Sequence, residues 1–207
     1  MRALYAILLL SLCIAGPLCA GSVLCVGDSL TAGYGLSKDE AYPAQLAARL
    51  RAAGHSNEVI NAGVSGDTTA GGLRRIDWLL RQPVDVLVLA LGANDGLRGL
   101  SPEAAETNLT QLIERVRAKH PDARVLLCGM QAPPNMGPDY AARLEAIYPR
   151  LARATGATLL PFLLEGVAGV PALNQADGIH PTAEGQRVIA DAVWAKLEPL
   201  LAGPPPR

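Results

Sequence analysis

The sequence predicts an α/β protein whose parallel sheet is covered by helices on both faces. Short apolar runs alternate with amphipathic stretches along the chain, an order typical of βαβ units. The run VDVLVLAL at 84–91 is apolar enough to be buried on both faces, like a central strand of a parallel sheet. The chain has 207 residues, of which 50% are hydrophobic and 18% charged, and this composition favours one domain with a full core.

Residues 22–91 are expected to form three strands and two helices. The spacing of Leu46 and Leu50 predicts one helix. The next helix is predicted by four apolar residues on one face, which are Leu73, Ile76, Leu79 and Leu80. We expect strands at 22–26, 58–61 and 84–91, and helices at 42–53 and 68–81.

The second half opens on a long helix with clear end signals. Ser101 is a good N-cap, Pro102 stands where its missing N–H costs nothing, and Glu103 favours the positive end of the helix dipole. Pro121 ends this helix near His120. We expect further strands at 124–129 and 158–160, and further helices at 139–155 and 182–201.

Residues 1–20 have the layout of a secretory signal peptide. Arg2 is followed by an apolar stretch that is short for a membrane span, and the segment ends in LCA before Gly21. The alternative is an uncleaved anchor helix. We therefore expect an exported protein, periplasmic or secreted, with one domain at 21–201, a flexible tail at 202–207 and no stable membrane insertion after cleavage.

Two cysteines, Cys25 and Cys128, remain after the leader, and both lie in apolar strand-like runs. We expect two buried free thiols rather than a disulfide, although export implies an oxidising compartment.

The formal net charge is -1 without long charged runs, so a nucleic-acid partner is not indicated.

Small polar segments follow the predicted strands. They are GDSL at 27–30, NAGVSGDT at 61–68 and GANDG at 92–96, and DGIHP at 177–181 precedes the last helix. Ligands of open parallel sheets bind at the carboxyl ends of the strands. We therefore expect these segments to meet at one site.

The residue types in these segments suit acyl transfer. Ser29 is the candidate nucleophile, and His180 the base that takes its proton. Asp177, three residues before His180, can orient the imidazole. The N–H of Ser29, the N–H of Gly66 and the side-chain amide of Asn94 can form an oxyanion hole.

Simpler roles compete with these interpretations. Ser29 alone would more often be a helix cap, and Ser65 is a rival serine, although no Gly-x-Ser-x-Gly motif exists in the chain. Asp28 and Asp95 are more typical of loop anchors. Asp177 and His180 could bind a metal, but no third or fourth ligand is evident, so we expect no metal and no cofactor.

The four segments together resemble the SGNH, or GDSL, hydrolase superfamily, and SGDTTAGGL, LGANDGLRG, LLPFLLEGV and DGIHPTAEG resemble its bacterial exported arylesterase, acyl-CoA thioesterase and lysophospholipase subgroup. Ala93 departs from the Gly expected in that subgroup. The resemblance implies a flavodoxin-like three-layer α/β/α fold with a five-stranded parallel sheet. It also implies a Ser29-His180-Asp177 triad and an oxyanion hole of Ser29, Gly66 and Asn94.

The implied activity is hydrolysis of carboxylic esters, with thioesters and lysophospholipids as further candidates. The loops between the four segments are apolar, so we expect a small ester or thioester with an apolar acyl or aryl group. The alternatives are an acetyl-esterase or acyltransferase acting on a saccharide and a non-catalytic binding protein on the same scaffold. A monomer is the default expectation.

Overall fold

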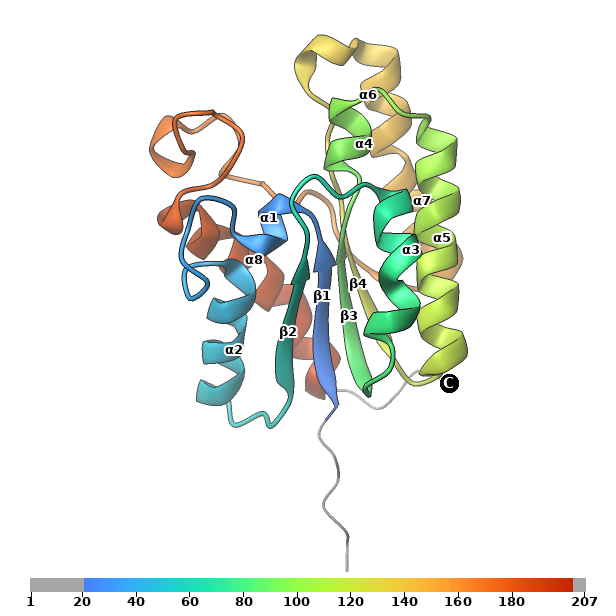
Figure 1. Cartoon of the computed structure of the whole chain (residues 1–207), viewed down its shortest axis with the longest axis vertical. Coiled ribbons are helices and arrows are strands. Elements are labelled where there is room, and N and C mark those ends of the chain that lie inside the picture. The colour runs from blue at the N-terminus through green and yellow to red at the C-terminus, as the bar shows by residue number, and fades with distance from the viewer. Residues whose placement is uncertain (1–20, 203–207) are drawn as a thin grey trace, which may run out of the picture.

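Five parallel strands form the centre of the molecule, in the order β2-β1-β3-β4-β5 (Figure 1). The computed structural model describes residues 21–202. The strands are β1 Ser22–Gly27, β2 Glu58–Gly63, β3 Val84–Ala90, β4 Arg124–Cys128 and β5 Thr158–Leu160. The predicted five-stranded parallel sheet is confirmed.

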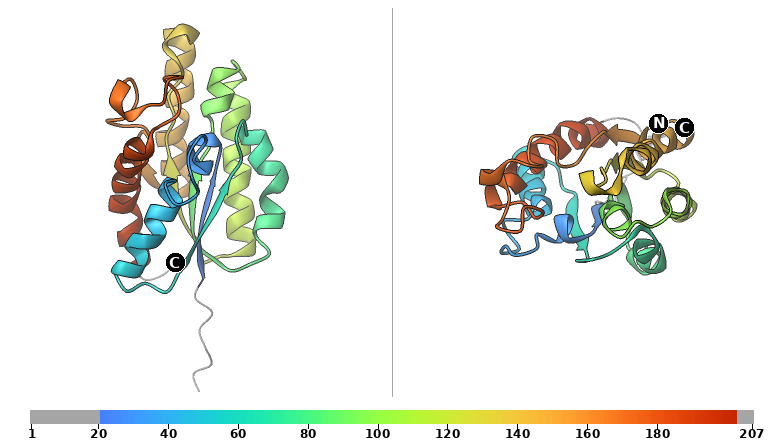
Figure 2. Two further views of the ribbon diagram at one scale, coloured as in Figure 1. Left: turned by 60° about the vertical axis from the view of Figure 1, so that its left-hand side comes forward. Right: turned by 90° about the horizontal axis from the view of Figure 1, so that it is seen from above.

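Helices cover both faces of this sheet, so the predicted α/β/α layering is also confirmed (Figure 2). Helices α2 and α8 pack together on one side, and α3, α5 and α7 pack in sequence on the other. The helices are α1 Ser29–Ala32, α2 Tyr42–Ala52, α3 Thr69–Leu79, α4 Ala93–Leu97, α5 Pro102–Lys119, α6 Pro138–Glu145, α7 Ile147–Thr155 and α8 Ala183–Ala202. Short 3-10 turns stand at Pro134–Met136 and Pro171–Leu173.

The long helix α5 begins and ends where its sequence signals predict. The Ser101 side chain accepts a hydrogen bond from the N–H of Ala104, and Pro102 is the first helical residue. The last helical residue is Lys119, two positions before Pro121. This agreement follows because both signals act on the backbone locally, whatever the rest of the fold does.

The prediction of one helix over 139–155 is wrong, because the chain forms α6 and α7 with a break at Ala146. Pro149 explains the break. It has no N–H to donate to the carbonyl of Glu145, and its ring crowds that carbonyl. Helix α6 ends at Glu145 for this reason.

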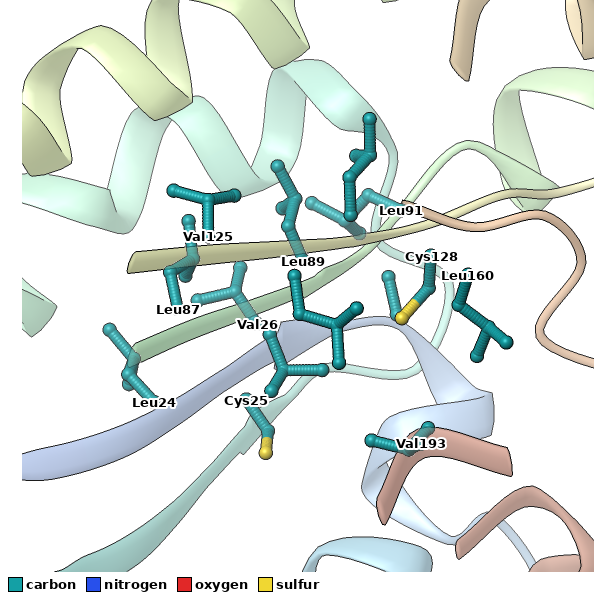
Figure 3. Packing of buried hydrophobic residues seen from close by; sticks show 14 of the residues in the cluster. Leu24, Cys25, Val26, Leu87, Leu89, Leu91, Val125, Cys128, Leu160 and Val193 are labelled. Atoms are coloured by element: carbon teal, nitrogen blue, oxygen red, sulfur yellow. The ribbon is translucent and has the colours of Figure 1, made fainter. Parts of the chain in front are cut away.

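The core lies between the sheet and the two helical layers. The strand side chains Leu24, Leu87 and Leu89 are fully buried (Figure 3). Cys25 and Cys128 are free and buried as predicted, and both lie on the side of the sheet that faces Val193 of α8 (Figure 3). Burial raises the pKa of both thiols, that of Cys128 to about 12, so these cysteines act as small hydrophobes.

The predictions of a leader at 1–20 and a tail at 203–207 lie outside the described residues. Ala202, which the tail was expected to include, is the last residue of α8. Within 21–202, no helix combines the length and the apolar character of a membrane span.

The direction in which the chain crosses from strand to strand reverses near the centre of the sheet. From β1 the chain crosses to β2 at one edge, then returns past β1 to β3 on its other side. The connections that follow β1 and β3 therefore leave in opposite directions, which opens a binding region at their carboxyl ends. Ser29 and Asn94 lie in these connections.

Candidate active site

Ser29 is held at the carboxyl end of β1 by tight packing around two glycines. A Cβ on Gly27 would lie 1.9 Å from Thr31 Oγ1, and one on Gly63 would lie 2.2 Å from the backbone nitrogen of Ala32. Only glycine lets β1 and β2 approach α1 this closely. Ser29 is the first residue of α1, so this packing fixes its position.

Ser29, His180 and Asp177 form one chain of hydrogen bonds. His180 Nε2 lies 3.0 Å from Ser29 Oγ, and His180 Nδ1 lies 2.7 Å from Asp177 Oδ2. Because an ionised carboxylate only accepts, Nδ1 carries the hydrogen and Nε2 is left to accept from the serine hydroxyl. The structure therefore brings the three predicted residues together in the order that a nucleophile, a base and an orienting acid require.

The Asp177 carboxylate also builds the turn that carries His180. Its Oδ1 accepts from the backbone N–H groups of Ile179, at 2.9 Å, and of His180, at 3.0 Å. The hydrogen bonds from the His180 ring and from these two N–H groups lower the pKa of Asp177 to about 2. The carboxylate is thus ionised at neutral pH, as an acceptor for Nδ1–H must be.

Asn94 reaches the loop of Ser29 through Asp28. Its Nδ2 donates to Asp67 O at 2.9 Å and to Asp28 Oδ2 at 3.2 Å. Both hydrogens of the Asn94 amide are therefore engaged, the second in the longer contact. The three loops that follow β1, β2 and β3 are joined at this one side chain.

Asp28, which precedes Ser29 in the chain, is fully buried. Its Oδ1 accepts from the N–H of Leu30 at 3.0 Å, which confirms the predicted role as a loop anchor. Burial raises the pKa of Asp28 to about 6, against the opposing effect of hydrogen bonds from Leu30 and Asn94. A buried carboxyl next to the serine is therefore costly to ionise.

Gly66 lies in the loop after β2 with a φ of +79°, a left-handed conformation that favours glycine. Its carbonyl accepts from Arg98 Nη2 at 2.8 Å. Among the described residues, the N–H groups of Gly66 and Ser29 donate to no hydrogen-bond acceptor. Two of the three predicted oxyanion donors are thus available.

Asp95 anchors the loop of Asn94 to α3, as predicted. It is 2% exposed, and its two oxygens accept from the N–H and the hydroxyl of Thr69 at 2.9 and 2.7 Å.

Within the described part of the chain, no three His, Cys, Asp or Glu side chains are grouped as a metal site would need.

Three residues near the site escaped the sequence-based prediction. The Tyr34 ring lies against the His180 ring, and the Gln175 side chain donates to the carbonyls of Tyr34 and Pro181. Buried Gln186 of α8 accepts from the N–H of Tyr42 and donates to the carbonyl of Leu30. In the sequence, Gln186 stands out as a polar residue among the apolar positions of α8. Tyr34 and Gln175 have no such signal.

A surface groove of about 710 Å³ lies over α2 and β2. Ala32 and Gly63 line it, but Ser29, Asn94 and His180 do not. The chemistry of the site therefore lies beside this groove and not inside it.

Comparison with known proteins decides the family. The model of the GDSL-like lipase/acylhydrolase family matches residues 25–188. The chain belongs to this family. The matched range begins in β1 and reaches into α8, so it contains every residue of the GDSL-like site described above.

Relatives in this GDSL-like family match most of the chain. Esterase TesA of Pseudomonas aeruginosa is 44% identical over 171 residues, which are 82% of this chain and 84% of the relative. Thioesterase 1/protease 1/lysophospholipase L1 of Escherichia coli is 41% identical over 82% of this chain and 80% of its own. The crystal structure of a psychrotrophic esterase, EstA of Pseudoalteromonas inhibited by monoethylphosphonate, superimposes with a TM-score of 0.82 at 34% identity, covering 88% of this chain and 100% of EstA.

Proposed function

We propose that this GDSL-like protein is a serine esterase that hydrolyses carboxylic esters through an acyl-enzyme. The single observation that carries the proposal is the hydrogen-bond chain from Asp177 through His180 to Ser29, with contacts of 2.7 and 3.0 Å. The names of the esterase and thioesterase relatives support the same class of reaction.

In the proposed first step, Ser29 Oγ attacks the ester carbonyl while His180 Nε2 takes the hydroxyl proton. The imidazolium that forms is stabilised by the ionised Asp177. His180 then returns the proton to the leaving alcohol or thiol. In the second step, His180 takes a proton from water, the resulting hydroxide attacks the acyl-enzyme, and Ser29 leaves with the proton restored.

The developing oxyanion is bound by the N–H groups of Ser29 and Gly66 and by Asn94. Both backbone N–H groups are available for such a ligand. Asn94 would give up its longer, 3.2 Å contact to Asp28 and keep the one to Asp67. Each donor of this kind contributes about 3 kcal/mol to transition-state stabilisation.

The proposed substrate is a small ester or thioester with an apolar acyl or aryl group. Three large apolar side chains, Val64, Leu97 and Ile179, are 45–47% exposed and stand within three positions of Gly66, Asn94 and His180. Exposed apolar groups beside polar reacting groups are typical of sites that bind such ligands. Lysophospholipids fit the same description.

We further propose that residues 1–20 direct export, so that the enzyme acts in the periplasm or outside the cell. A monomer is the proposed oligomeric state. The positive start and the short apolar stretch of this segment support export.

The Ser29→Ala variant tests the proposal. It should lose nearly all hydrolysis of p-nitrophenyl acetate and butyrate, because the nucleophile is absent, whereas Ser65→Ala should keep most of it. A panel of acetyl, long-chain acyl, thioester, lysophospholipid and acetylated saccharide substrates then compares the esterase with the saccharide-directed alternatives. Full activity of Ser29→Ala would overturn the mechanism, and no activity of the unaltered protein on any of these esters would favour the binding protein.

A further inference from the structure

The ring of Tyr34 lies against the ring of His180. Their centroids are 4.4 Å apart and the planes are tilted by 37°. Tyr34 follows α1, and its backbone N–H donates to the carbonyl of Ser29 at 3.1 Å. The left-handed turn at Gly33, with a φ of +77°, lets the chain fold back so that Tyr34 returns to the serine.

Gln175 ties the segments that carry these two rings. Its Nε2 donates to the carbonyl of Tyr34 at 2.7 Å and to that of Pro181 at 2.9 Å. Its backbone N–H donates to the carbonyl of His180 at 2.7 Å. One residue therefore holds the backbone on both sides of the ring contact.

The contact completes the restraint of the His180 imidazole. Asp177 and Ser29 bind the two ring nitrogens, which lie on the edge of the ring. The ring moves by rotation about its side-chain torsions, and these two hydrogen bonds restrain that rotation through the nitrogens alone. The Tyr34 ring, whose centroid lies 4.4 Å from that of His180, adds a steric restraint on the same rotation.

Tyr34 also suits the charge that His180 gains during the reaction. When the imidazole takes the serine proton it becomes a cation, and an aromatic ring within about 6 Å attracts a cation through its quadrupole. The same contact is weaker for the neutral imidazole. It therefore favours the transition state over the ground state.

We propose that Tyr34 is a positioning residue for His180 and that Gln175 holds Tyr34 in place. This inference rests on the proposed function, in which His180 is the base. The competing role for Tyr34 is a wall of the substrate site, because its side chain is 52% exposed. The two roles affect different kinetic constants.

The first experiment compares Tyr34→Leu with Tyr34→Phe, using p-nitrophenyl acetate and butyrate. The leucine keeps apolar bulk without a π face, and kcat should fall about 2- to 30-fold for both esters with KM nearly unchanged. The phenylalanine keeps the ring and should restore kcat. Trp78→Leu, which removes a 65% exposed aromatic side chain from α3, is the control and should match the unaltered enzyme.

The rate at which diethyl p-nitrophenyl phosphate inactivates the enzyme provides a readout that does not depend on an acyl chain. It should fall in Tyr34→Leu by the same factor as kcat, because it reports activation of Ser29. A change in KM alone, or an unchanged inactivation rate, would overturn the proposal in favour of a substrate wall.

The second experiment replaces Gln175 with Glu, whose carboxylate cannot donate to the two carbonyls. We expect a fall in kcat in the same direction as in Tyr34→Leu, and no further fall when the two changes are combined. Gln45→Glu, which removes a similar amide-to-carbonyl bond to Glu40, is the matched control. Additive losses in the double variant would show that Gln175 acts independently of Tyr34.

The Ser29→Ala variant distinguishes a failure of this inference from a failure of the proposed function. If it is inactive while Tyr34→Leu and Tyr34→Phe both match the unaltered enzyme, only this inference fails. If Ser29→Ala keeps its activity, the proposed function fails with it. Unfolding temperatures measured for every variant show whether a loss of rate comes from unfolding.

Discussion

At the scale of single residues, Asp28 is the least ordinary group of the site. Its side chain is fully buried, yet it accepts from both Leu30 and Asn94. Burial outweighs these bonds and raises the pKa of Asp28 from 3.8 to about 6. The residue that anchors the nucleophile loop therefore weakens the fold as it ionises.

The Asp28→Asn variant should reveal this effect as a change in the pH dependence of stability. In the unfolded chain Asp28 loses its proton near pH 4, whereas in the folded chain it keeps the proton to about pH 6. Between these values the folded state binds more protons, so the free energy of unfolding falls as pH rises.

Asparagine does not titrate and removes this slope. From pH 4 to 7, the free energy of unfolding of the variant minus that of the unaltered protein should increase by up to about 3 kcal/mol. Urea unfolding at several pH values measures the difference, and any cost of the substitution that is independent of pH cancels. Parallel curves for the two proteins would contradict the raised pKa.

The residues that sequence reasoning found and missed differ in a physical way. Ser29, Asp177 and His180 stand in short segments whose residue types already suggest their chemistry. Tyr34 and Gln175 meet across 141 positions of the chain. Their contact depends on the path of two loops, which no local pattern encodes.

At the scale of elements, the packing of α1 against β1 and β2 positions the serine. Helix α1 has four residues, too few to be stable alone. The close approach permitted by Gly27 and Gly63 therefore holds it in place. The strands act as a rigid base for the nucleophile.

Gly63→Ala should disturb the packing of α1 that positions Ser29. Its Cβ would lie 2.2 Å from the nitrogen of Ala32, so α1 must shift. We expect a loss of about 1–3 kcal/mol in the free energy of unfolding and a clear fall in kcat, measured by urea unfolding and ester hydrolysis.

Gly156→Ala is the control for this prediction. Gly156 has a φ of +66° and open space around it, so alanine should cost about 1–2 kcal/mol through backbone strain and leave kcat unchanged. An unchanged kcat in Gly63→Ala would refute the link between this packing and the serine.

Elements with strong local signals were predicted well, and the exceptions have local causes. The caps and flanking prolines of α5 fixed its ends to within a residue or two. The prediction of one helix over 139–155 fails because Pro149 divides this segment into α6 and α7. Helix α1 is too short for any periodic pattern, and the sequence indicates it only through Ser29 as a possible helix cap.

At the scale of the whole molecule, the sheet order brings distant segments to one place. Residues 28, 67, 94 and 180 come from four connections, and hydrogen bonds link Asp28 to Asn94, Asn94 to Asp67, and His180 to Ser29. The alternation of strands and helices predicted the sheet. That alternation does not predict the order of the strands, which is seen only in the structure.

The central claim is that Ser29 is a nucleophile activated by His180, and site mapping with a fluorophosphonate tests it most directly. The unaltered protein and the His180→Ala variant are treated with the reagent and then digested, and mass spectrometry locates the adduct and follows its rate of formation. We predict one adduct, on Ser29, which forms rapidly in the unaltered protein and very slowly in His180→Ala. An adduct on Ser65 instead, or equal rates for Ser29 in both proteins, would contradict the account.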